Sequence, residues 1–84
     1  MSDIEELMGE ARIDGDGDVW DIASDAVSVS ITVDDLAEEW VLSFVNSEDL
    51  TQYVYLALDV DSAEIVSWLR AQGISSKNIK LNAE

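Results

Sequence analysis

The sequence predicts a single α+β domain, residues 1–84, with an N-terminal and a C-terminal helix on one face of an antiparallel sheet. Three internal segments alternate apolar and polar residues with the period of half-buried strands. Short connections join these segments, and parallel neighbours would need crossovers of a dozen or more residues, so we expect an antiparallel meander. Segments with helical periodicity flank them. A chain of this length has no room for a second core.

The N-terminal helix is expected from about Asp3 to Ala11. Ser2 and Glu5 have the Ser-x-x-Glu spacing of a capping box. Its apolar residues recur at the spacing that places them on one side of a helix, at Ile4, Leu7, Met8 and Ala11. The helix should end before the Asp-Gly-Asp-Gly run, which has no periodicity.

The meander is predicted over three segments, Ala26 to Val33, Glu39 to Val45 and Gln52 to Val60. One or two further short strands can extend it. Residues 19–23 give the first candidate, a short strand with Trp20 and Ile22 facing inward, with a helical turn as the alternative.

The C-terminal helix is the best-punctuated element. It should run from about Ser62 to Gln72, with Asp61 as its N-cap and Gly73 at its C-terminal end. The tail, residues 77–82, alternates again. If it is a strand, a right-handed crossover through the helix places it parallel in the sheet; a frayed tail fits equally well.

The core predicted from these elements draws on all of them. It comprises Ile4, Leu7, Met8, Val27, Val29, Ile31, Trp40, Leu42, Phe44, Val54, Leu56, Leu58, Ile65 and Leu69, with Trp68 at its margin.

Charge is the dominant feature of the composition, with 19 acids against 4 bases and a net charge of -15. The charge is segregated, because residues 1–64 hold 18 acids and a single base, Arg12, while residues 65–84 hold three bases and one acid. Such a field repels nucleic acid and anionic membranes and attracts a basic protein surface at a salt-dependent rate. We therefore expect a basic protein partner and no direct contact with nucleic acid or membrane.

Several functional classes lack support in the composition. The chain has no Cys and no His, which removes thiol nucleophiles, thiolate zinc sites and the commonest general base. It also has no glycine-rich phosphate loop, so we expect a non-enzymatic protein without cofactor or metal. With no apolar run of 18 residues and an acidic start, the expected location is the cytoplasm, that of the host cell if a phage encodes the chain.

The run from Asp14 to Asp18 invites a calcium interpretation, since carboxylates at loop positions 1, 3 and 5 can face one cation. Three features argue against it. Position 6, which needs Gly, is Val19; position 12, which needs a bidentate Glu, is Asp25; and the residues that follow look like a strand. Weak divalent binding or a solvated acidic turn are the remaining interpretations.

The acids also have a spacing relevant to recognition. Alternate residues of an extended segment lie about 6.6 Å apart, and helix neighbours four positions apart lie about 6 Å apart. Both distances are close to the distance between successive phosphates on one strand of a nucleic acid. The candidates for partner contact are Glu6, Glu10, Asp14, Asp16, Asp18, Asp21, Asp34, Asp35, Glu38 and Glu39. A solvated acidic face is the simpler alternative.

The second face of the predicted sheet is a further candidate. It collects hydroxyl-bearing residues, a few aliphatics and two tyrosines, Tyr53 and Tyr55. Tyrosine is favoured at interfaces because it supplies rigid area with a polar tip. Partner binding or homodimerisation through this face is therefore expected, although open antiparallel faces are common.

In size, acidity and order of elements the chain resembles the small phage-encoded inhibitors of bacterial defence, of the anti-CRISPR and anti-restriction type. The resemblance implies an acidic inhibitor that binds a basic, nucleic-acid-handling protein, such as a CRISPR effector or nuclease, and blocks nucleic-acid access, in the manner of a DNA mimic. Two alternatives stay open. One is a halophile-adapted acidic domain, and the other is an immunity protein or antitoxin that neutralises a nuclease toxin.

Overall fold

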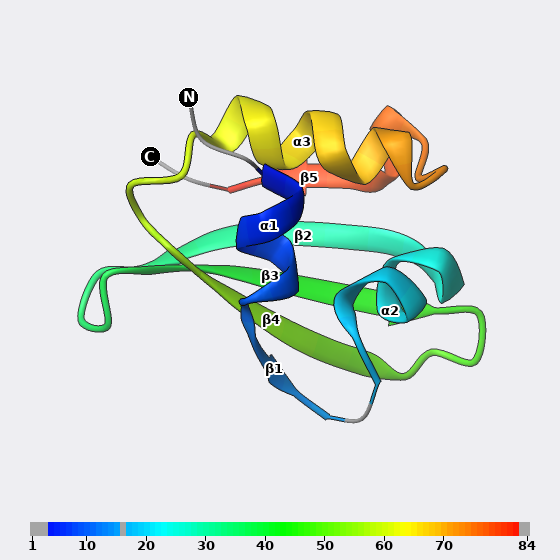
Figure 1. The fold of residues 1–84 in the computed structure, drawn as a ribbon. Coiled ribbons are helices and arrows are strands. Elements are labelled where there is room, and N and C mark those ends of the chain that lie inside the picture. The colour runs from blue at the N-terminus through cyan, green and yellow to red at the C-terminus, as the bar shows by residue number, and fades with distance from the viewer. Residues whose placement is uncertain (1–3, 16, 83–84) are drawn as a thin grey trace.

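A computed structural model describes residues 4–15 and 17–82, which form three α-helices, one short 3-10 helix and a five-stranded sheet (Figure 1). In chain order the elements are α1 (Ile4–Gly9), β1 (Arg12–Asp14), α2 (Val19–Asp25), β2 (Ala26–Asp34), β3 (Glu39–Asn46), β4 (Thr51–Ala57), α3 (Ser62–Ala71), η1 (Ser76–Asn78) and β5 (Ile79–Leu81). The predicted α+β class is confirmed. The capping box at Ser2 lies outside the described residues.

The sheet has the strand order β1-β4-β3-β2-β5. The meander β2-β3-β4 is antiparallel, as predicted, and β1 adds to it by pairing antiparallel with β4. At the other edge β5 pairs parallel with β2, with Val29 opposite Ile79. The sheet is therefore mixed, and the prediction of a purely antiparallel sheet is wrong. β5 is parallel to β2 because the chain returns through α3, the route that the alternating tail indicated.

All three helices contribute to one core on one face of the sheet (Figure 1). The strands supply alternate residues to it, and the opposite residues of each strand form an uncovered face. The buried side chains are Met8, Val19, Ile22, Ala23, Val29, Ile31, Trp40, Leu42, Phe44, Val54, Leu56, Val60, Ile65, Trp68, Leu69 and Ile74. The helices thus cover one side of the domain and leave the other side to the sheet alone.

The short strand expected over residues 19–23 is wrong, and the helical alternative is confirmed, because this segment lies in the helix α2. Asp18 is its N-cap, and the Asp18 carboxylate accepts a hydrogen bond from the Asp21 backbone N–H at 2.9 Å. Val19, Ile22 and Ala23 then face the core at helical spacing. Trp20 does not face inward with Ile22 as predicted. It is 39% exposed and lies edge-on to Trp68, with ring centroids 6.3 Å apart.

Two further predictions about β2 and β4 need correction. Val27 is not a core residue, since it is 49% exposed. A register shift between the pairs Ala26–Asn46 and Ser28–Val45 marks a bulge there, which breaks the alternation. The strand β4 ends at Ala57, three residues before the predicted end, because the Val60 N–H bonds to the Ala57 carbonyl in a turn.

The C-terminal helix follows its prediction closely. Asp61 caps α3 by accepting a hydrogen bond from the Ala63 N–H, and Gly73 has a φ of +99°, which favours glycine at the helix end. Trp68 is a core residue rather than a marginal one, with 3% of its surface exposed. The half-buried Leu58, Ile4 and Leu7 pack against the core from its edge.

Candidate partner-binding surfaces

The described carboxylates are all at least partly solvent-accessible, because the buried set contains no charged or polar residue. Arg12, the one base of residues 1–64, forms an ion pair with one acid. Its guanidinium forms an ion pair with Glu39 at 2.9 Å and stacks over the Tyr55 ring at 4.3 Å. Most of the negative charge of the described chain is therefore presented to solvent.

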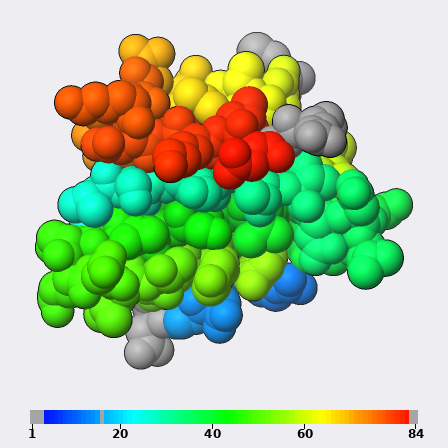
Figure 2. All heavy atoms as spheres, turned by 180° about the vertical axis from the view of Figure 1, so that it is seen from behind, coloured from blue at the N-terminus to red at the C-terminus, as the bar shows by residue number. Residues whose placement is uncertain are grey.

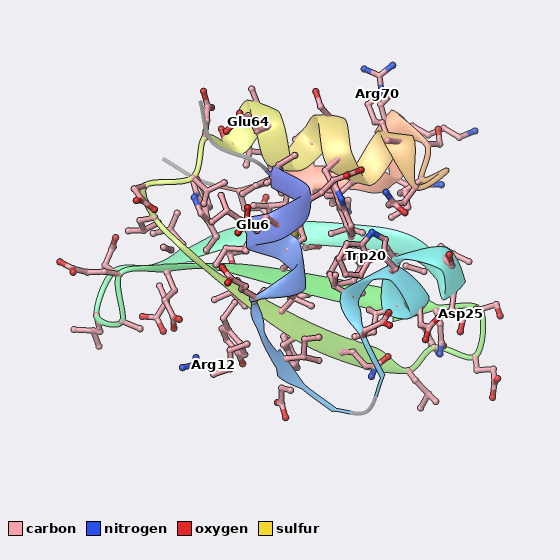
Figure 3. The ribbon with its side chains drawn as sticks, in the orientation of Figure 1. Glu6, Arg12, Trp20, Asp25, Glu64 and Arg70 are labelled. Carbon is pink, nitrogen blue, oxygen red and sulfur yellow. The ribbon has the colours of Figure 1, made fainter. Side chains whose placement is uncertain are left out.

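The helix side of the domain carries the first acidic group. Glu6 and Glu10 project from α1 and its C-terminal end, and Asp21 and Asp25 are four positions apart on α2; all four are exposed. Figure 3 shows Glu6 and Asp25 on the two helices that lie over the same face of the sheet. Neighbours four positions apart on a helix are about 6 Å apart. The structure thus adds Asp25 to the acids that the sequence singled out.

The β2–β3 hairpin carries the second acidic group, comprising Asp34, Asp35, Glu38 and Glu39. Asp34 shapes the turn, because its carboxylate accepts hydrogen bonds from the backbone N–H groups of Leu36 and Ala37. Glu38 has a φ of +55°. Asp35 and Glu38 are exposed, whereas Glu39 is half-buried beside Arg12. These acids come together, but at one end of the sheet rather than on the helices.

Asp14 and Asp18, the two loop acids that the structure describes, belong to different elements. Asp14 ends β1 and Asp18 caps α2, and the chain between them turns at Gly15 and Gly17, which have φ values of +124° and +92°. A Cβ on Gly15 would also lie 2.8 Å from the Gln52 side-chain nitrogen. Asp16 lies outside the described residues. The two glycines therefore have a structural role, which is to connect an edge strand to a helix.

The same loop bears on the calcium interpretation. One argument against it is wrong, because the segment after the loop is a helix and not a strand. The other two features, Val19 at position 6 and Asp25 at position 12, still argue against a calcium loop. Val19, at the position that needs glycine, is buried, and the Asp18 carboxylate is engaged in capping α2. Within the described residues, which leave out Asp16, no three carboxylates are grouped to hold a metal ion.

A groove of about 300 Å³ lies beside the ion pair. Its polar lining is Glu10, Arg12, Glu39 and Tyr55, which come from three separate places in the sequence. Its apolar lining is Leu7, Ala11, Leu56, Ala57 and Val60. Three residues predicted as partner contacts, Glu10, Glu39 and Tyr55, therefore meet at one site. An apolar floor with two carboxylates suits the aliphatic stem and charged head of a basic side chain.

The uncovered sheet face holds the two predicted tyrosines, Tyr53 and Tyr55, and the small residues opposite them on β3 and β2. Figure 2 shows this face from behind, with β5, β2, β3, β4 and β1 as successive bands. Its charged residues are Arg12 and Lys80 against Asp14, Asp34 and Glu39. Its net charge is therefore only -1, in a chain of net charge -15.

Comparisons of this chain with protein-family models, with curated proteins and with solved structures gave no match. Among the described residues, no helix has the length and apolar character needed to cross a membrane.

Sequence patterns missed two of the residues that shape these surfaces. Asp25 was considered only as position 12 of a calcium loop, and helical spacing from Asp21 would have placed it with the candidate contacts. Arg12 was noted only as a lone base. Its position opposite Tyr55 depends on the pairing of β1 with β4, which no local pattern specifies.

Proposed function

We propose that this protein is a non-enzymatic acidic inhibitor that binds the basic surface of a nucleic-acid-handling protein and so blocks nucleic-acid access. The observation that carries the proposal is the exposure of the described carboxylates over the helices and hairpins. Residues 1–64 hold 18 acids and a single base, Arg12. A basic nucleic-acid groove is the protein surface that such a field attracts most strongly.

The helix side supports the proposal better than the loop from Asp14 to Asp18 does. Asp21 and Asp25 on α2 keep an approximate phosphate spacing on a rigid element, whereas Asp14 and Asp18 belong to different elements. Competition with nucleic acid would then arise from α1 and α2, with the groove at Glu10 and Glu39 accepting a basic side chain of the target. This arrangement is a partial DNA mimic in charge rather than in shape.

The test is a panel assay with purified CRISPR effectors, restriction endonucleases and nuclease toxins, in which DNA binding and cleavage are measured with and without this protein. We expect one class to lose DNA binding at stoichiometric inhibitor, with an affinity that falls steeply as salt rises. Inhibition of a nuclease toxin would identify the immunity-protein form of the proposal. Absence of inhibition throughout the panel at low salt would contradict it.

A variant that carries both Glu10→Lys and Asp25→Lys tests whether the helix side contacts the target. Glu10→Lys and Asp25→Lys both place a cation at the C-terminal end of a helix, where the helix dipole favours it, so we expect the fold to be retained. The matched control is Glu48→Lys with Asp59→Lys, two exposed acids outside the candidate contacts, which changes the net charge equally. A large loss of affinity in the first variant and a small loss in the second is the expected result. Equal losses would show that only total charge matters.

A further inference from the structure

We infer that the uncovered sheet face is a homodimer interface, on which a second copy of this chain packs face to face with the two central β3 strands aligned. The inference goes beyond the proposed inhibitory function, which uses chiefly the helix side, although the groove residues Arg12, Glu39 and Tyr55 border both surfaces. It starts from the contrast between this face, with a net charge of -1, and the whole chain, with -15. A surface that is nearly neutral in so acidic a chain can approach its own copy with little repulsion.

The charges of this face are arranged so that a second copy complements them. One cross-strand row contains, from edge to edge, Asp14, Tyr53, Ser43, Ser30 and Lys80. Stacked sheets keep their strand directions within about 30° of each other. We place a two-fold axis between the two sheets, parallel to both β3 strands, so that Ser43 of one copy faces Ser43 of the other. This axis lays β1 of one copy over β5 of the other. The acidic end of each row then faces the basic end of its partner, twice in the dimer.

The sizes of the side chains are complementary under the same axis. The large residues of the face, Tyr53 and Tyr55, are on β4, and the residues that would face them are the small hydroxyl-bearing Ser30 and Thr32 on β2. Val41, which pairs with both Tyr55 and Thr32, lies on the axis strand and meets its own copy. Large side chains thus meet small ones on both sides of an aliphatic and hydroxyl centre.

One end of the face brings like charges together, because Glu39 on β3 would lie near Glu39 of the other copy. Each Glu39 already has its own cation, with Arg12 at 2.9 Å. The neighbouring acid, Asp34, turns its carboxylate toward the backbone of its own hairpin. The ion pair within each copy therefore offsets the repulsion between copies.

The area sets the strength of the expected dimer. Thirty strand residues make up the sheet, which at about 3.3 Å per residue and about 4.8 Å between strands gives a face of about 500 Å² per copy. Specific interfaces usually bury about 800 Å² per partner, and weak, transient ones bury less. We therefore expect a reversible dimer with a dissociation constant of the order of tens of micromolar.

Sedimentation equilibrium of the purified chain over low to high micromolar concentration tests the inference, at low salt and at about 0.5 M salt. We expect the mass to rise from 9.2 kDa toward twice that value. High salt should strengthen the dimer, because the charge outside the interface is repulsive between copies. A partner held by opposite charge responds to salt in the opposite direction. A mass of 9.2 kDa under every condition overturns the inference.

Two pairs of variants identify the face. Ser43→Lys puts two cations together on the axis and should abolish the dimer. Ser67→Lys, on the exposed side of α3, makes the same charge change on the helix side and should leave the dimer intact or slightly stronger. Asp14→Lys and Lys80→Asp should each weaken the dimer, and the double variant should restore it. A dimer that survives Ser43→Lys, or a double variant weaker than both single ones, overturns the proposed packing.

Discussion

The two buried tryptophans of the core differ in one hydrogen bond, and this difference makes a quantitative prediction. Trp40 and Trp68 are 8% and 3% exposed. The Trp40 indole N–H donates to the Val60 carbonyl at 2.8 Å, whereas the Trp68 indole N–H has no acceptor among the described residues. Replacing each by phenylalanine removes the same atoms from the core, so the loss of packing largely cancels between the two variants.

The N–H groups then decide the difference in the free energy of unfolding. Trp40→Phe removes a buried hydrogen bond and leaves the carbonyl of Val60, a residue that is itself buried, without its donor, which costs about 1–3 kcal/mol. Trp68→Phe removes a buried donor that has no partner, and regains a penalty of about the same size. We expect Trp40→Phe to be destabilising by at least about 2 kcal/mol more than Trp68→Phe. This is a large share of the stability of a chain of this size, roughly 4–12 kcal/mol.

Urea unfolding followed by circular dichroism measures both variants, with the slope m checked for constancy so that the midpoints can be compared. Trp20→Phe is the control, because Trp20 is 39% exposed and the substitution should cost less than Trp40→Phe. Equal destabilisation of the Trp40→Phe and Trp68→Phe variants, or a larger effect at Trp68, would refute the reasoning.

Three further predictions concern the acidic surface. Asp18→Ala should lower the free energy of unfolding by about 1 kcal/mol through loss of the bond to the Asp21 N–H, while Asp18→Asn should restore most of it; equal effects in thermal unfolding would contradict a capping role. Arg12→Ala should lower the free energy of unfolding by about 1 kcal/mol at low salt, because it removes the ion pair with Glu39 and the contact with the Tyr55 ring. Arg12→Lys should recover only part of that free energy. An unchanged melting temperature in Arg12→Ala would contradict this prediction. The melting temperature should rise with added salt because the net charge is -15, and CaCl2 and MgCl2 of equal ionic strength should raise it alike. A rise specific to calcium would restore the calcium interpretation. Unfolding in the absence of molar salt would support the halophile alternative.

The strands and the last helix could be predicted because local signals agreed there. Ser28, Ser30 and Thr32 alternate with apolar residues in β2, and Asp61 and Gly73 mark the ends of α3. Their predicted bounds differ from the structure by a residue or two, except where β4 turns early.

The segment after the acidic loop could not be predicted in the same way. In residues 19–23, apolar side chains at Val19, Ile22 and Ala23 fit a helix, whereas Trp20 and Ile22 alone fit a strand, and so short a run does not separate the two periods. The capping bond of Asp18 decides for the helix. The bulge that exposes Val27 leaves no trace in an alternating sequence.

The candidate surfaces were predicted as residue types but not as places. Tyr53 and Tyr55 were expected on the open face and are there. The meeting of Glu10, Arg12 and Glu39 depends on β1 joining the edge of β4, a long-range pairing that local patterns do not contain.

The parallel strand β5 has a consequence for how the chain folds. Its partner residues on β2, Val29 and Ile31, are separated in sequence from Ile79 and Leu81 by the rest of the meander and by α3. A contact of such sequence separation is slow to form, so the outer edge of β2 stays unpaired until most of the domain is in place. An open, apolar-rich strand edge is a site for pairing between chains. We expect the strong negative charge of residues 1–64 to keep copies apart during that interval, a role in folding beside the one proposed for the acidity in recognition.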